Sequence, residues 1–204
     1  MSITATGLSR LDAVTLNESY QQLLETASRL CSGPVAWQQR KKNEARELLA
    51  LAQCSRRFVV LELDLLCELR AVLVMKATVP CLSHPGARLQ LMRSAVLGLN
   101  YPQEAMFLPQ AGTGSFCILA PQQVWHPNVN YEHPQVCCLG TQAAGIRVRE
   151  LVITVFGLLC FQNLDQELDP NNPQGVLNVP AAHYWQENVN RLPLSKEAFF
   201  VQTP

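Results

Sequence analysis

Two adjacent cysteines follow a His-Pro-Asn segment in the middle of the chain, and these residue types together could carry out acyl transfer. The run WHPNVNYEHPQVCCL places His126, Pro127 and Asn128 ahead of Cys137 and Cys138. A thiolate is a strong nucleophile, and its thioester stays energised enough for an amine to attack it, so a cysteine suits an acyl carrier. A side-chain amide held in a rigid turn can donate a hydrogen bond to the negative oxygen that forms. In an extended strand only one of the two thiols can face the turn.

The N-terminal quarter of the chain predicts an arm followed by two helices. Residues 1–16 show no sustained period and predict a loose arm. Residues 17–31 place apolar side chains at helical spacing, with Asn17 as the N-cap. A second helical pattern runs from about residue 37 to residue 53. These helices precede the segments that could form a sheet.

The middle of the chain predicts an antiparallel meander. Residues 69–79, 88–99 and 115–120 are expected as strands, and residues 58–66 as a strand or a buried helix. The sequence His-Pro-Gly at residues 84–86 predicts the turn between two of these strands.

Beyond the cysteines the pattern becomes helical again. Residues 147–161 predict an amphipathic helix that packs on the sheet, with an apolar face of Val148, Leu151, Val152, Val155, Leu158 and Leu159. An Asp-Pro step and an Asn-Pro follow, and then the run PAAHYWQEN at residues 180–188.

These features, taken in order, resemble the ubiquitin-conjugating enzymes. The order is an aromatic residue before His-Pro-Asn, a Cys-Leu pair, an amphipathic helix, an Asp-Pro step and an Ala-Ala helix. The resemblance covers residues 121–190 well and residues 69–109 loosely. It implies an α/β (α+β) fold of the ubiquitin-conjugating type, a four-stranded antiparallel meander flanked by helices with an N-terminal helical extension. Residues 1–40 would form the arm and first helix, and residues 41–204 the conjugating domain.

The resemblance assigns roles to the residues of the first motif. Cys138, which precedes a leucine, matches the nucleophile, and Cys137 is the alternative if the register shifts by one. Asn128 matches the family's oxyanion donor. Pro127 fixes the turn, and His126 is expected to support it by hydrogen bonding rather than to act as a base.

An incoming lysine is protonated near neutral pH, so the site must favour its neutral form or accept its proton, and the resemblance implies a carboxylate for this role. Asp169 is the position that matches the family's carboxylate, with Asp165 as a neighbour, and a turn residue before Pro170 is an equal alternative for Asp169. Gly140 stands where the family commonly has an aspartate after Cys-Leu. The connection from the turn to the cysteine is also about two residues longer than usual.

The expected function is to accept a ubiquitin-like modifier protein from a ubiquitin-activating-like enzyme as a cysteine thioester and to transfer it to an amine of a target protein. No cofactor is implied. By analogy the chain is similar to conjugating proteins of bacterial ubiquitin-like systems associated with phage defence. Two alternatives stay open: a catalytically inactive variant that acts as a binding partner, and a cysteine hydrolase for which His133 would have to serve as base.

The composition limits the number of domains and the classes of partner that can be expected. The chain has 204 residues, 48% of them hydrophobic, which predicts one domain with an extension. Lys+Arg and Asp+Glu both number 16, so no basic excess points to nucleic acid. No apolar run is long enough for a membrane span and no signal peptide is recognisable, so a soluble, cytoplasmic protein is expected.

The basic cluster and the cysteines are not expected to form binding or metal sites. The basic cluster Arg40, Lys41 and Lys42 predicts a solvated helix face more than a binding surface. The 8 cysteines are expected to stay thiols in a reducing cytosol, and a metal site is not expected because no Cys-x-x-Cys pair exists. Three of them lie in apolar runs and are expected in the core: Cys67, Cys117 and Cys160.

Overall fold

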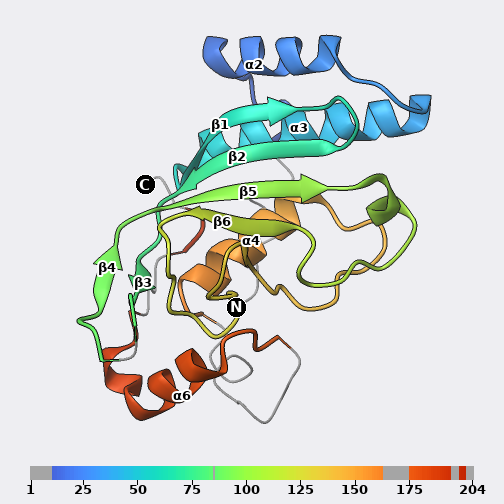
Figure 1. Cartoon of the computed structure of the whole chain (residues 1–204). Helices are drawn as coiled ribbons and strands as arrows, with labels where there is room; N and C mark the ends of the chain where they lie inside the picture. The colour runs from blue at the N-terminus through green and yellow to red at the C-terminus, as the bar shows by residue number, and fades with distance from the viewer. Residues whose placement is uncertain (1–10, 85, 163–174, 194–197, 201–204) are drawn as a thin grey trace.

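The computed structural model describes residues 11–84, 86–162, 175–193 and 198–200 and shows a mixed α+β fold (Figure 1). Short 3-10 turns are η1, η2 and η3, at Leu11–Ala13, Gln103–Met106 and Val189–Arg191. The described α-helices are α2 (Glu18–Arg29), α3 (Val35–Ser55), α4 (Val148–Leu159) and α6 (Val179–Glu187). The strands are β1 (Phe58–Asp64), β2 (Leu69–Met75), β3 (Val79–Cys81), β4 (Gln90–Met92), β5 (Ala95–Tyr101), β6 (Phe116–Ala120) and β7 (Gln135–Val136).

The main sheet has the strand order β1-β2-β5-β6-β7, and every neighbouring pair is antiparallel. Buried and less buried side chains alternate along β2 and β5, because successive side chains of a strand point to opposite faces. Leu73 and Leu97, for example, are register partners and are both fully buried. The predicted antiparallel sheet is confirmed, and the short strand β7 extends it beyond the four expected strands.

Two of the predicted strands are divided in the structure, and this part of the prediction was wrong. Strand β2 ends at Met75, and β3 and β4 form a separate two-stranded sheet before β5 begins. The reason is that β3 pairs on its other side with the segment leading to the His-Pro-Asn turn. Cys81 bridges to Val124, and the Pro80 carbonyl accepts the N–H of Trp125 at 2.7 Å.

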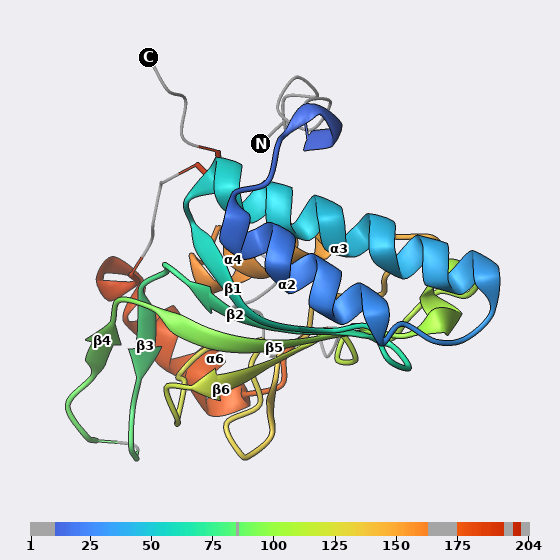
Figure 2. The ribbon, with the colours of Figure 1, turned by 90° about the horizontal axis from the view of Figure 1, so that it is seen from above.

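Helices α3 and α4 lie together on one face of the main sheet, as the two perpendicular views show (Figures 1 and 2). The predicted apolar face of α4 is confirmed, since all six of its residues are buried. The matching face of α3 is also buried and consists of Ala45, Leu48, Leu49 and Ala52. This sandwich of sheet and helices holds the main hydrophobic core.

The residues before α2 that the structure describes are packed, so the prediction of a loose arm is wrong for them. Leu11 and Leu16 are buried. Arg46 on α3 donates to the carbonyl oxygens of Leu11 and Val14, at 3.5 and 3.1 Å. This segment shows no periodic pattern, but burial of its two leucines removes apolar surface from water and so stabilises its packing.

Helix α2 lies along α3 and the outer edge of the sheet (Figure 2). Asn17 is the N-cap, and its side chain accepts the N–H of Tyr20 at 2.9 Å, which confirms the predicted helix start. The Tyr20 hydroxyl in turn accepts the N–H of Val60 on edge strand β1, at 3.3 Å. Helix α3 then runs without a break through residue 40, where the predicted division between extension and domain falls.

The basic cluster of α3 is not a solvated face. Lys41 is fully buried, and Arg40 is only partly exposed. The Lys41 ammonium donates to the carbonyl oxygens of Ser32, Leu65, Leu66 and Cys67. A buried ammonium is tolerated only when its hydrogens are accepted. These carbonyls lie in the turn before α3 and in the turn between β1 and β2. The lysine therefore joins those turns to the helix.

A second charged group joins α3 to the start of α4. Glu44 is fully buried and forms ion pairs with Arg40, at 2.9 Å, and with Arg147. Its other carboxylate oxygen accepts the N–H of Val148 at 2.8 Å, in the first turn of α4. Glu47 pairs with the same arginine, Arg147. Glu44 thus accepts one of the backbone N–H groups that have no partner within α4, and both carboxylates hold Arg147, the N-cap residue of α4.

The 8 cysteines form no disulfide, and of the three expected in the core only Cys160 is buried. Cys160 is buried and Cys117 is half-buried. Cys67 is exposed, because it lies in the turn between β1 and β2, where its carbonyl rather than its side chain points inward to Trp37 and Lys41.

Candidate active site

The His-Pro-Asn segment is buried between the end of α4 and the residues that lead into α6. The Nδ1 atom of His126 accepts the N–H of Asn128 at 3.0 Å, so the ring hydrogen resides on Nε2, which donates to the carbonyl of Leu158 at 2.9 Å. The ring of Phe161 lies 4.2 Å away, centroid to centroid. Burial lowers the pKa of His126 to about 3, because no water solvates the imidazolium. Both nitrogens of a neutral ring are thus occupied, and neither can take a proton.

Pro127 connects this turn to α6. Its carbonyl accepts two N–H groups, from Leu177 at 2.7 Å and from Asn178 at 2.9 Å. The Asn178 side chain accepts the N–H of Ala181 at 3.0 Å and caps α6. The position of the turn and the start of the last described helix are therefore fixed together.

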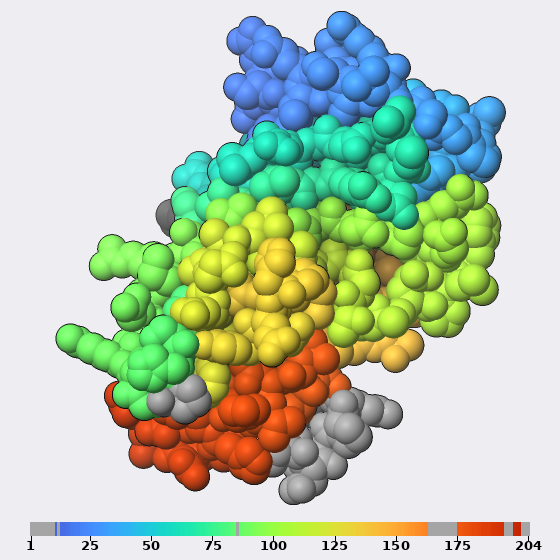
Figure 3. All heavy atoms as spheres, viewed as in Figure 1, coloured from blue at the N-terminus to red at the C-terminus, as the bar shows by residue number. Residues whose placement is uncertain are grey.

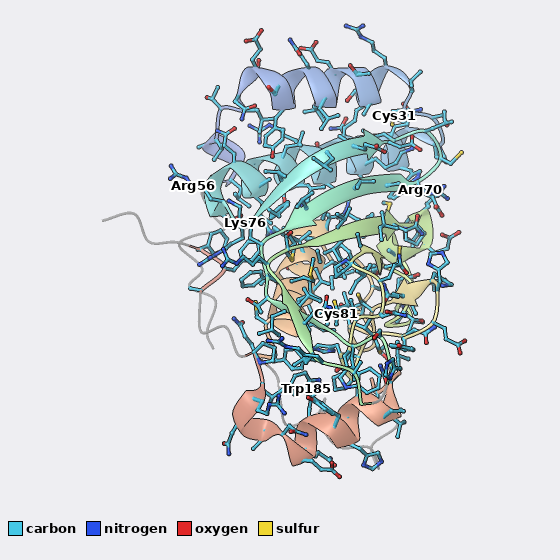
Figure 4. The ribbon with its side chains drawn as sticks, turned by 60° about the vertical axis from the view of Figure 1, so that its left-hand side comes forward. Cys31, Arg56, Arg70, Lys76, Cys81 and Trp185 are labelled. Carbon is cyan, nitrogen blue, oxygen red and sulfur yellow. The ribbon has the colours of Figure 1, made fainter. Side chains whose placement is uncertain are left out.

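Aromatic residues of α6 complete the contact with the turn. Trp185 donates its indole N–H to the carbonyl of Trp125 at 2.8 Å, and its ring meets Phe161 edge to face at 5.5 Å. Figure 4 shows Trp185 at the junction of α6 with the rest of the molecule. In the space-filling view the yellow surface, which belongs to the segment that follows β6, lies directly above α6 (Figure 3). Trp125, Phe161 and Trp185 belong to a second, smaller hydrophobic core that is separate from the main one.

The Asn128 side chain is 6% exposed and points toward the segment before α6. Its Nδ2 donates to the carbonyl of Gly175 at 2.6 Å, and its Oδ1 has no hydrogen-bond partner among the described residues. Gly175 has a φ of +99°, and a Cβ there would lie 3.0 Å from the Asn128 amide nitrogen. A glycine is required at this close approach.

A short antiparallel pairing brings the asparagine and the second cysteine onto one face. Val129 bridges to Cys137, and the N–H of Cys138 donates to the carbonyl of Asn128 at 2.8 Å. Residues directly opposite in such a pair share a face, and their neighbours share the other. Val129 and Cys137 are both fully buried, so Asn128 and Cys138 face the other way.

The two thiols consequently differ in burial. Cys137 is fully buried, and burial raises the pKa of its thiol because the thiolate would lose its solvation. Cys138 is half-buried and retains contact with solvent. The pairing therefore favours Cys138 over Cys137 as the nucleophile.

The loop at residues 110–114 supports the other side of the cysteine. The N–H of Leu139 donates to the carbonyl of Gly112 at 2.9 Å, and a Cβ on Gly112 would lie 2.7 Å from the backbone nitrogen of Gly140. Gln110 and Gln142 bridge the same two segments. Sequence reasoning missed both glutamines and Gly175, because isolated residues in aperiodic segments give no pattern to read.

Three further residues were candidates from the sequence. Asp169 and Asp165 lie outside the described residues. His133, the base that a hydrolase would need, is exposed in the loop before the cysteines.

The chain matches no family model, no curated protein and no solved structure. Within the described ranges, no group of His, Cys, Asp or Glu side chains could hold a metal ion. No helix in that part of the chain has the length and apolar character to cross a membrane.

Proposed function

We propose that the chain is a ubiquitin-conjugating-like enzyme that carries a ubiquitin-like modifier as a thioester on Cys138 and transfers it to an amine of a target protein. The observation that carries this proposal is the pairing of Asn128 with Cys138. It places an amide donor and a solvent-accessible thiol on one face, while Cys137 is buried on the other.

The arrangement of elements supports a ubiquitin-conjugating-like fold. Strands β1, β2, β5 and β6 follow one another in both chain order and sheet order, interrupted by the β3–β4 hairpin. Helix α3 precedes this sheet, and α4 and α6 follow the cysteines. The proposed N-terminal extension corresponds to α2 and the residues before it.

The proposed reaction has two steps. First, the Cys138 thiolate attacks the carbonyl carbon of the modifier's thioester on the activating enzyme, a new C–S bond forms, and the activating enzyme's thiolate leaves. Second, a neutral target amine attacks the same carbonyl carbon, a C–N bond forms, the C–S bond to Cys138 breaks, and the amine loses a proton. Each step passes through a tetrahedral intermediate with a negative oxygen.

Asn128 is the proposed donor to the oxygen that forms in the second step, when the amine attacks. Its amide nitrogen carries two hydrogens, and the bond to Gly175 uses one of them. His126 is neutral and bonded at both nitrogens, so it holds the turn and is not the base. Asp169 remains the proposed proton acceptor, on the resemblance alone.

A non-catalytic binding variant is the second candidate. The observation in its favour is the same bond from Asn128 to Gly175, because holding the loop is a sufficient role for this amide without any catalysis. The two candidates differ in one outcome: the binding variant forms no thioester.

The test is a non-reducing gel of the chain with its cognate activating enzyme, ubiquitin-like modifier and ATP. The proposal expects a thiol-sensitive adduct that Cys138→Ala abolishes and Cys137→Ala retains. In a chase with free lysine, Asn128→Ala should load normally but discharge about 100-fold more slowly, the effect of losing one oxyanion donor. No adduct from a charged activating enzyme would favour the binding variant.

A further inference from the structure

The residues directly after Cys138 form a turn that a single buried side chain holds. Gln142 is 7% exposed, and its amide nitrogen donates to the carbonyl oxygens of Leu139, at 2.7 Å, and of Gly140, at 2.6 Å. An amide has two N–H hydrogens, and each has an acceptor here. Gly140 has a φ of +71° and no side chain with which to anchor the turn itself.

The backbone of Gln142 is also fixed. Its N–H donates to the carbonyl of Gln110 at 2.9 Å, and its carbonyl accepts the N–H of Gln110 at 3.0 Å. Gly112, two residues further along that loop, accepts the N–H of Leu139. Backbone pairing therefore connects Gln142 to the loop at residues 110–114, and the Gln142 side chain holds the turn after Cys138.

Cys138 thus lies between two fixed points. On one side its own N–H is bound to Asn128. On the other side Gly112 holds the next peptide, and Gln142 holds the two peptides after it. The direction in which a thiol points is set by its backbone, and a half-buried thiol has little other restraint. We propose that Gln142 is a positioning residue that fixes the Cys138 backbone so that the thiol faces Asn128. The catalytic consequence of this role rests on the proposed function.

The replacement Gln142→Glu keeps the size of the side chain but removes both donors and places a carboxylate against two carbonyl oxygens. Gln142→Leu removes the donors without adding charge and serves if the glutamate variant fails to fold. Gln122→Glu is the matched control, because the Gln122 amide also donates to a backbone carbonyl, that of Leu119 at 3.0 Å, but on an exposed turn elsewhere.

The readout is alkylation by iodoacetamide, followed peptide by peptide with mass spectrometry. We expect the Cys138 rate to change about tenfold in the Gln142 variants, as the loss of two neutral hydrogen bonds allows, and to stay at the wild-type value in Gln122→Glu. Cys137 monitors local unfolding, because its fully buried thiol reacts only when the pairing opens. An unchanged Cys138 rate, or a parallel rise at both cysteines, would overturn the positioning role.

A second readout separates positioning from stability. In the lysine chase, Gln142→Leu should lower the maximal discharge rate and leave the lysine concentration at half-maximal rate unchanged. The reason is that the turn adjoins Cys138 and not the incoming amine. The alkylation assay needs no activating enzyme. A missing thioester with the expected alkylation pattern would therefore contradict the proposed function and leave the assignment of Gln142 intact.

Discussion

Acidification should destabilise the protein through His126, and replacing this residue should remove that part of the pH dependence. The pKa of His126 is about 3 in the folded protein, against 6.5 for an unperturbed histidine. Above both values the imidazole is neutral in the folded and unfolded states, and its contribution is fully favourable. As the pH falls below 6.5 the unfolded chain binds a proton that the folded protein excludes, so stability decreases until the folded pKa is reached.

The magnitude follows from the size of this window. Each pH unit within it costs about 1.4 kcal/mol, so acidification to about pH 5 should cost roughly 2 kcal/mol. His126→Gln offers one acceptor and one donor in a similar shape, for the N–H of Asn128 and the carbonyl of Leu158, but it does not titrate.

The assay is urea unfolding of the wild type and of His126→Gln at about pH 7.5 and about pH 5. At each pH the free energy of unfolding of the variant is subtracted from that of the wild type. The contributions of other titrating groups cancel in that difference. From about pH 7.5 to about pH 5 the difference should change by roughly 2 kcal/mol in favour of the variant. A difference that is the same at both pH values would refute the account of His126 as a buried, permanently neutral support of the turn.

Three other substitutions test the contacts that hold the site in place. Lys41→Met should lower the free energy of unfolding by about 3 kcal/mol or more, since four carbonyls lose a charged donor, whereas the neighbouring Lys42→Met should change it by less than about 0.5 kcal/mol. Glu44→Ala should cost about 3 kcal/mol in the same urea titration, at the low end for a buried ion pair because its arginine partners reach solvent. Gly175→Ala should cost about 1–2 kcal/mol through backbone strain and break the bond to the Asn128 amide, which a shift of the side-chain amide signals in an NMR spectrum would report; unchanged signals would contradict this contact.

Periodic patterns predicted the elements of the fold well. The apolar faces of α3 and α4 and the N-cap at Asn17 could be read from spacing and residue type alone. The division of the predicted strands around β3 and β4 could not, because it depends on a bridge from Cys81 to Val124, far away in the sequence. Long-range pairing leaves no trace in a local pattern.

The burial of charged side chains was the property predicted least well from the sequence. Lys41 stands in a run of basic residues that is typical of a solvated helix face, yet four carbonyl groups from two turns surround it. At the site, the pattern identified the His-Pro-Asn turn and the pair of cysteines but left their register open. Burial of Cys137 and the pairing of Cys138 with Asn128 are tertiary facts, and so are the contacts of Gln142.

The most direct test of the central claim is to replace the nucleophile with an oxygen analogue. Cys138→Ser, incubated with the activating enzyme, modifier and ATP, should form an adduct that resists thiol reductants and is cleaved by alkali, as an ester is, whereas the adducts of the wild type and of Cys137→Ser should remain thiol-sensitive. A thiol-sensitive adduct that persists in Cys138→Ser, or no adduct in the wild type beside a charged activating enzyme, would contradict the claim that Cys138 carries the acyl group.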